Sequence, residues 1–148
     1  MEFEREKSAG YMTNWAARLF AREIYRRLAA IGVSPGQLPL FFALGNGGSL
    51  SQKALAEVAA IEQPTMAATL SRMERDGLIE RRPDPKDGRS ALVSLTPAAM
   101  AKVVHVKGAM QAVNSIALGK LSKSEREKLL ALLRIVVASL EESLKDET

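Results

Sequence analysis

Hydrophobic residues recur at intervals of three or four along most of the chain, which is the spacing of helices that pack on one face. The first run predicts a long helix over residues 8–31 that ends at Gly32. The next predicted helix is short. It begins at residues 34–37, where serine, proline and glutamine form a capping box, and it ends in the glycine cluster at residues 45–48.

The middle of the chain passes from short helices to a hairpin. One short helix is expected after Ser51, and the next over residues 63–76, where Gly77 ends it. Within residues 78–95, two short runs of strand-like sequence flank a turn rich in proline, aspartate and glycine. The pattern predicts a two-stranded β-hairpin directly after three short helices.

Two long apolar helices are expected at the end of the sequence. One begins at Thr96 and Pro97 and reaches about Gly119. Ser122 and Glu125 form the capping box that starts the other, which runs to about Lys145.

Three short helices followed by a two-stranded wing describe a winged helix-turn-helix. The predicted fold is therefore mainly α with a small β-wing, in one domain over residues 1–148. The winged helix-turn-helix should occupy residues 34–96. The helices at 8–31 and 97–145 are too apolar to be solvated on all sides, so we expect them to be dimerisation helices of a homodimer.

Composition excludes several kinds of chemistry. The 148 residues include no cysteine and one histidine, so disulfides, thiol chemistry and multi-histidine metal sites are not expected. We expect no metal and no cofactor. The first ten residues are charged and do not read as a signal peptide, and the longest apolar run, at 129–140, is shorter than the roughly 20 residues of a membrane span. A cytoplasmic protein without a membrane partner is expected.

Net charge says little about the partner. The chain carries a formal charge of +4, but residues 34–98 hold seven basic and seven acidic side chains. Binding to nucleic acid must therefore depend on where individual arginines lie.

Residues 50–96 contain a helix that ends in Met-Glu-x-x-Gly-Leu-Ile, a wing with Asp-x-Arg, and a final Leu-Thr. With these motifs the segment resembles the MarR family of bacterial transcription regulators. The Ile-Glu-Gln-Pro-Thr segment is similar to the SlyA-like branch, and weaker similarity extends from Gly10 to residues 119–133. The resemblance implies a regulator that binds a pseudo-palindromic operator in double-stranded DNA, and in particular a repressor released by a small aromatic or amphipathic ligand.

The helix at 63–76 is the expected reader of the major groove. Met66, Leu70 and Met73 share one face and should point into the core, which leaves small and polar residues for DNA. The resemblance also makes Arg89 a minor-groove contact whose guanidinium is oriented by Asp87, and Arg81 is expected to meet phosphate. The predicted DNA-contacting residues are Ser51, Gln63, Pro64, Thr65, Ala68, Thr69, Arg72, Arg82, Lys86, Asp87 and Arg89.

An effector site is expected where the long helices meet the winged helix. Aromatic walls and a basic or imidazole group there would suit a small aromatic acid or phenol, although the same residues serve equally well as core or interface. The predicted ligand-binding residues are Tyr11, Trp15, Arg18, Phe41, Phe42 and His105. The series Arg18, Arg22 and Arg26 reads as a solvated stripe or as intersubunit pairs.

The sequence contains no pattern of an enzyme. The glycine cluster at 45–48 follows a helix and not a strand, and His105 has no local Ser/Asp motif beside it. The alternative to a DNA-binding regulator is a winged-helix module that binds protein and has reduced DNA affinity. The small, uncharged residues Ala67 and Ala68 on the recognition face keep this alternative open. Ser71 and Gly88 are further departures from the family pattern, and they leave the particular operator open.

Overall fold

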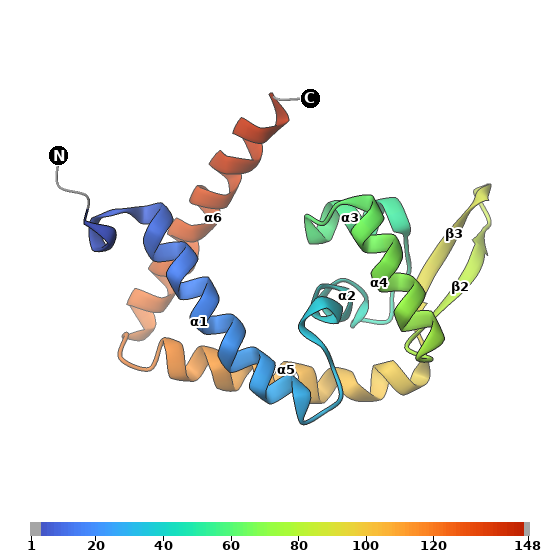
Figure 1. The fold of residues 1–148 in the computed structure, drawn as a ribbon, viewed down its shortest axis with the longest axis horizontal. Coiled ribbons are helices and arrows are strands. Elements are labelled where there is room, and N and C mark those ends of the chain that lie inside the picture. The colour runs from blue at the N-terminus through green and yellow to red at the C-terminus, as the bar shows by residue number, and fades with distance from the viewer. Residues whose placement is uncertain (1–3, 147–148) are drawn as a thin grey trace. The chain divides into compact units, whose positions relative to one another are not determined.

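The computed structural model describes residues 4–146 (Figure 1). The predicted fold class is confirmed: long helices flank a winged helix-turn-helix. The elements are α1 (Ala9–Ala29), α2 (Leu38–Leu44), β1 (Leu50–Ser51), α3 (Gln52–Ala59), α4 (Gln63–Arg75), β2 (Ile79–Asp84), β3 (Asp87–Leu95), α5 (Pro97–Ala117) and α6 (Lys123–Lys145). Single 3₁₀ turns at Arg5–Lys7 and Pro35–Gln37 precede α1 and α2. The chain divides into two compact units, residues 1–111 and 112–148.

Side chains cap the helices where the sequence predicts helix starts. The hydroxyl of Ser122 accepts from the backbone N–H of Glu125 at 3.1 Å, and the Glu125 carboxylate accepts from the Ser122 N–H at 2.8 Å. A second capping box joins Ser34 and Gln37. These bonds satisfy N–H groups that a helix leaves without an internal partner, and so they define where each helix begins.

The wing is part of a three-stranded antiparallel sheet. Its strand order is β1-β3-β2, with Ile79 opposite Leu95 in the hairpin and Leu50 opposite Val93 at the other edge. Sequence reasoning missed β1, because two residues are too few to show an alternating pattern. Pairing of β1 fixes the start of α3 against the wing.

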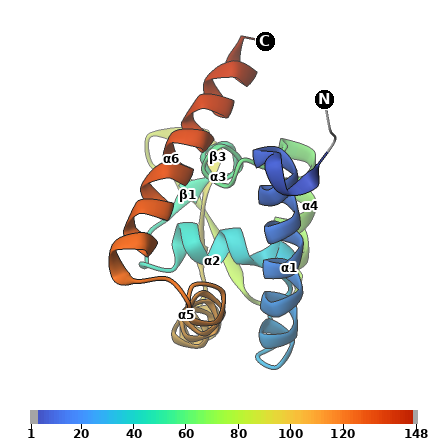
Figure 2. The same ribbon diagram turned by 90° about the vertical axis from the view of Figure 1, so that its left-hand side faces the viewer.

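One hydrophobic core holds the winged helix-turn-helix together. The end of α1, helices α2 to α4, the sheet and the first half of α5 all contribute to it, and α2 lies directly over α5 in Figure 1 and Figure 2. Met66, Leu70 and Met73 are fully buried, as predicted. The other fully buried large side chains in this core are Leu28, Leu40, Leu44, Leu55 and Val93.

Helix α6 is amphipathic in sequence but has no buried residue in the structure. Its large apolar side chains are open to solvent, among them Leu130, Leu132, Ile135, Val137, Leu140 and Leu144. None of the helices within residues 4–146 combines the length and apolar character needed to cross a lipid bilayer.

Candidate nucleic-acid interface

Helix α4 presents a polar face opposite its buried one. Gln63, Pro64, Thr65, Ala68 and Arg72 are all exposed, whereas Thr69, the sixth predicted contact residue of this helix, is buried. The early proline, which needs no N–H partner in the first helical turn, starts the helix. This surface carries amide, hydroxyl, methyl and guanidinium groups, which are the groups that read base edges in a major groove.

Thr69 is a correction to the predicted contact set. Its side chain is only 6% exposed, and its hydroxyl donates to the backbone carbonyl of Thr65 at 3.0 Å. The position lies three residues after Met66 and four before Met73, so it falls on the inward face of the helix. Thr69 therefore lies on the buried side of α4 and is not part of its exposed surface.

Ser51 begins α3 and is partly buried. Its hydroxyl oxygen accepts from the backbone N–H of Ala54 at 3.1 Å, which is the N-cap bond of that helix. The hydroxyl hydrogen can still donate to a phosphate, because one serine can act in both ways.

Two aspartates determine the shape of the wing tip. A carboxylate oxygen of Asp84 accepts from the backbone N–H of Lys86 at 2.9 Å, and one of Asp87 accepts from the N–H of Arg89 at 3.1 Å. Such bonds are favoured two residues along a tight turn. Asp87 therefore holds the backbone of Arg89 and not its guanidinium, which corrects the expected orienting role.

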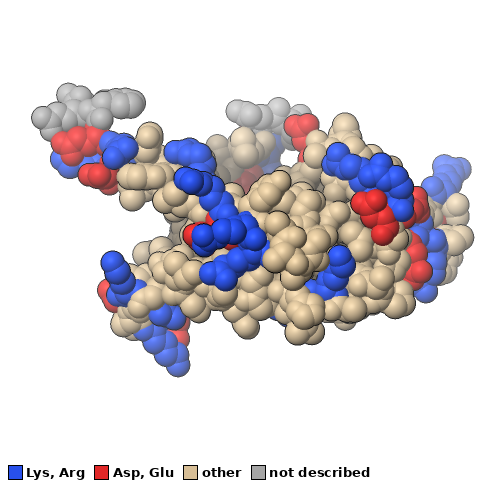
Figure 3. Space-filling model, turned by 60° about the horizontal axis from the view of Figure 1, so that its bottom comes forward, with Lys and Arg blue, Asp and Glu red and all other residues tan. Residues whose placement is uncertain are grey.

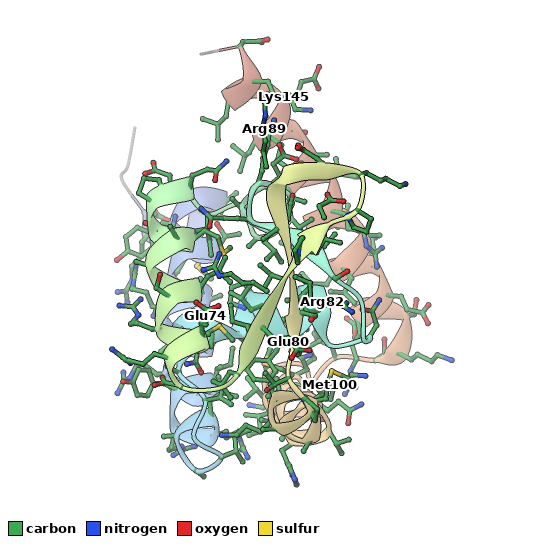
Figure 4. All side chains as sticks on the ribbon, turned by 90° about the vertical axis from the view of Figure 1, so that its right-hand side faces the viewer. Glu74, Glu80, Arg82, Arg89, Met100 and Lys145 are labelled. Atoms are coloured by element: carbon green, nitrogen blue, oxygen red, sulfur yellow. The ribbon has the colours of Figure 1, made fainter. Side chains whose placement is uncertain are left out.

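The arginines of the wing gather around a shallow depression on the hairpin. Arg81, Arg82 and Arg89 line it together with Pro83 and residues 88–91. Figure 4 shows Arg89 at the far end of the hairpin and Arg82 nearer its base. The side chains of Arg82, Lys86 and Arg89 are exposed. The wing thus offers separate cations along its length, as contacts to successive phosphates and a minor groove require.

Arg81 differs from the other wing arginines. Its Nε lies 3.3 Å from an Oε atom of Glu74 on α4, and its side chain is 30% exposed. Sequence reasoning placed Arg81 among the phosphate contacts and did not identify Glu74. The seven-residue separation points to an ion pair only once the register of β2 against α4 is known.

On the face of the molecule that Figure 3 shows, basic side chains lie in separate groups, with acidic side chains beside several of them. This agrees with the even balance of charges in residues 34–98. A broad positive field is thus absent from residues 34–98, which favours specific arginines as the contacts of any nucleic acid.

A small groove opens between α2 and α5 within residues 1–111. Its volume is about 230 Å³. Phe41 and Phe42, two of the predicted ligand residues, line it, and so does Lys107, which was not among the predicted residues. The groove is lined by Phe41, Phe42, Gly45, Asn46, Val103, Val106, Lys107 and Met110.

The other four predicted ligand residues do not line this groove. The rings of Tyr11 and Trp15 meet edge to face on α1, with centroids 6.3 Å apart, and the Arg5 guanidinium lies 4.4 Å from the Trp15 centroid. Arg18 is exposed on the same helix. His105 is exposed on α5. It lies on a different face of that helix from residues 103, 106, 107 and 110, which line the groove. The six predicted ligand residues therefore do not all line this groove of the described chain.

Comparison with known proteins identifies the class. Residues 31–90 match the model of the MarR family. The transcriptional regulator HosA of Escherichia coli O111:H- is 33% identical over 98 residues, which cover 66% of this chain and 73% of that protein. The chain belongs to the MarR family, whose members are transcription regulators and not enzymes.

Solved structures agree with this assignment. A probable transcriptional regulator from Pseudomonas aeruginosa has a TM-score of 0.79 and 31% identity, and the match covers 90% of this chain and 99% of that one. A mutant of MarR from E. coli complexed with operator DNA has a TM-score of 0.82 at 20% identity, over 92% of this chain and 99% of that one. The second likeness is one of fold.

Proposed function

We propose that the protein is a homodimeric transcription regulator that binds a pseudo-palindromic operator in double-stranded DNA. The observation that carries the proposal is the division of α4 into two faces. Met66, Leu70 and Met73 hold one face in the core, whereas Thr65 and Arg72 stand exposed on the other. A wing with exposed arginines follows directly in the chain, and a MarR structure of the same fold is bound to operator DNA.

The proposed homodimer explains the exposed apolar residues of the long helices. Tyr11, Met12 and Leu19 on α1 are at least 40% exposed, and most of the apolar residues of α6 are also exposed. A second copy would cover both helices and place two recognition helices about 34 Å apart, one turn of DNA. Sedimentation equilibrium at micromolar concentration should give the dimer mass, and a monomer mass would contradict the proposal.

The decisive test of DNA binding is selection of bound fragments from random duplexes. We expect a pseudo-palindrome with half-sites about one helical turn apart, and an affinity that falls steeply with salt. Thr65 and Arg72 substitutions should change the preferred bases. A chain that binds no duplex in a salt-sensitive way would instead support the protein-interaction module that the small residue Ala68 on the recognition face favours.

We further propose repression that is relieved by a small aromatic carboxylate bound in the α2–α5 groove. Phe41 and Phe42 supply aromatic walls and Lys107 a cation, which together suit a ring that carries an acid group. Such a ligand acts only if it favours the arrangement that does not bind DNA; a tenfold preference corresponds to about 1.4 kcal/mol.

The effector proposal is tested by titrating the operator complex with salicylate and with its neutral amide. Operator release by the acid, loss of that release in Lys107→Gln and weak response to the amide are expected. The matched control is Lys102→Gln on the same helix, since the Lys102 ammonium donates to the carbonyl of Ile31 at 3.2 Å and does not line the groove. Equal responses of both variants would contradict a role for Lys107.

A further inference from the structure

We propose that Glu74 and Arg81 form a positioning pair that fixes the wing relative to the recognition helix, and that Arg81 is not a phosphate contact. The inference rests on the proposed DNA binding by α4 and the hairpin. It assigns a new role to Arg81, which was expected to contact phosphate, and a first role to Glu74. The pair spans the turn between the two DNA-reading elements, with Nε and Oε 3.3 Å apart.

The turn that the pair spans is short and already constrained on one side. Gly77 adopts φ +73°, and the backbone N–H of Leu78 donates to the carbonyl of Met73 at 2.8 Å. The hydroxyl of Thr96 donates to the Gly77 carbonyl at 2.7 Å. These bonds hold the turn itself, and β2 beyond it is paired with β3; a contact to α4 further along the strand would limit how far the hairpin tilts against that helix.

Glu74 and Arg81 supply that contact. Figure 4 shows Glu74 near the C-terminal end of α4, with the hairpin beside it. Side chains alternate across a strand, so Arg81 shares a face with the buried Ile79. Its guanidinium therefore extends from the inward side of the hairpin toward α4.

The two neighbours of Arg81 on β2 point the other way and provide matched controls. Glu80 and Arg82 are both exposed, and neither forms an ion pair with a residue in the described part of the chain. They carry the same charges as Glu74 and Arg81. Substitutions at these positions change the charge of the wing equally without touching the pair.

Two readings of Arg81 predict opposite effects of removing Glu74. If Arg81 contacts phosphate, Glu74 competes with DNA for the guanidinium, and its neutralisation strengthens binding. If the pair positions the wing, neutralisation lets β2 tilt and weakens binding, since affinity depends on preorganised contacts. The structure favours the second reading because a phosphate at Arg81 would also approach the Glu74 carboxylate.

The test measures operator affinity over a range of salt concentrations for the full chain and for E74Q, R81Q, E80Q, R82Q and the E74Q/R81Q double variant. We expect E74Q and R81Q each to weaken binding by about three- to tenfold, and the double variant to lose no more than the larger single loss. E80Q should bind at least as well as the unchanged protein. R82Q should lower the salt slope by about one, whereas R81Q should change it much less.

Amide hydrogen exchange of the free protein gives a second readout. The β2 amides should exchange faster in E74Q than in E80Q, while melting temperatures stay close, because exposed ion pairs contribute little to global stability.

Tighter binding by E74Q, to the same extent as by E80Q, would overturn the positioning role, and so would unchanged exchange in β2. Absence of operator binding by the unchanged protein would overturn the proposed function and this inference with it. The unchanged protein therefore separates the two failures.

Discussion

The winged helix-turn-helix and the last helix, α6, differ in whether their large hydrophobic side chains are buried. In the first, leucines at 40, 44, 55 and 70 are fully buried within one core. In α6, Leu140 and Leu144 are 60% and 62% exposed, and no residue of the helix is buried. Both segments show the same helical spacing of apolar residues in the sequence.

This contrast shows what hydrophobic spacing does and does not determine. It specifies a helix with one apolar face, but the partner of that face must be supplied by the fold or by another molecule. Large apolar side chains that remain exposed along a whole helix are typical of interaction surfaces. The winged helix-turn-helix thus buries its apolar faces within one chain, whereas the apolar residues of α6 stay exposed.

The largest expected effect comes from disrupting the proposed dimer interface on α6. Leu140→Asp should convert the dimer to a monomer and weaken operator binding by about 100-fold or more, because two linked half-site contacts become independent. Sedimentation equilibrium and operator titration measure the two effects.

The matched control for this change is Ala138→Asp, which adds the same charge at an exposed position two residues before Leu140, on the opposite side of α6. If Leu140→Asp stays dimeric, α6 does not build the interface, and the comparison between the two regions loses its explanation.

Leu70→Ala should produce the largest loss of stability within the winged helix-turn-helix. The side chain is fully buried, so its truncation leaves a cavity and should lower the free energy of unfolding by about 2–5 kcal/mol. Urea unfolding measures the change. Val58→Ala on α3, which is 66% exposed, should cost less than about 0.5 kcal/mol. Similar losses at both positions would mean that the core is not as the structure describes it.

A smaller effect is expected at the exposed end of the wing. Arg89→Ala should weaken operator binding by about 1–3 kcal/mol and reduce the preference for A·T pairs beside the half-site. Lys86→Ala should weaken specific and random duplexes alike. Unchanged operator affinity in Arg89→Ala would show that the wing does not enter the minor groove.

Sequence patterns predicted the helices of the winged helix-turn-helix because each carries its own start signal and its own apolar face. The inward side of α4 was correct at Met66, Leu70 and Met73. Thr69 was assigned to the wrong side, although it lies between Met66 and Met73 on the same face. The prediction gave more weight to the polar hydroxyl of this residue than to its position on the helix.

Contacts that depend on three-dimensional register were not predictable in this way. The pairing of Glu74 with Arg81 requires the tilt of β2 against α4, and the two-residue strand β1 requires its partner β3. Asp87 was assigned to a guanidinium, but a backbone N–H two residues away is nearer in a tight turn. Local competition of this kind decides where a short polar side chain bonds.

The smallest expected effect is a difference in how acid changes the stability of the first turns of α6 and α3. Hydrogen bonds from the Ser122 backbone and side chain hold the pKa of Glu125 below its ordinary value of 4.5. A carboxyl group with a lowered pKa stabilises the folded state above that value, and the stabilisation is lost as the pH falls through the lower folded pKa. Ser51 caps α3 without an acidic partner, since Ala54 occupies the corresponding position, so its cap has no such pH dependence.

Amide exchange between pH 6 and pH 3 should therefore show fraying of α6 at residues 122–126 before any change at the start of α3. Glu125→Gln keeps an oxygen that accepts from the Ser122 N–H and removes the titration, so its α6 terminus should respond to acid no more than α3 does. If the Gln variant frays at the same pH as the unchanged protein, the capping carboxylate is not the cause.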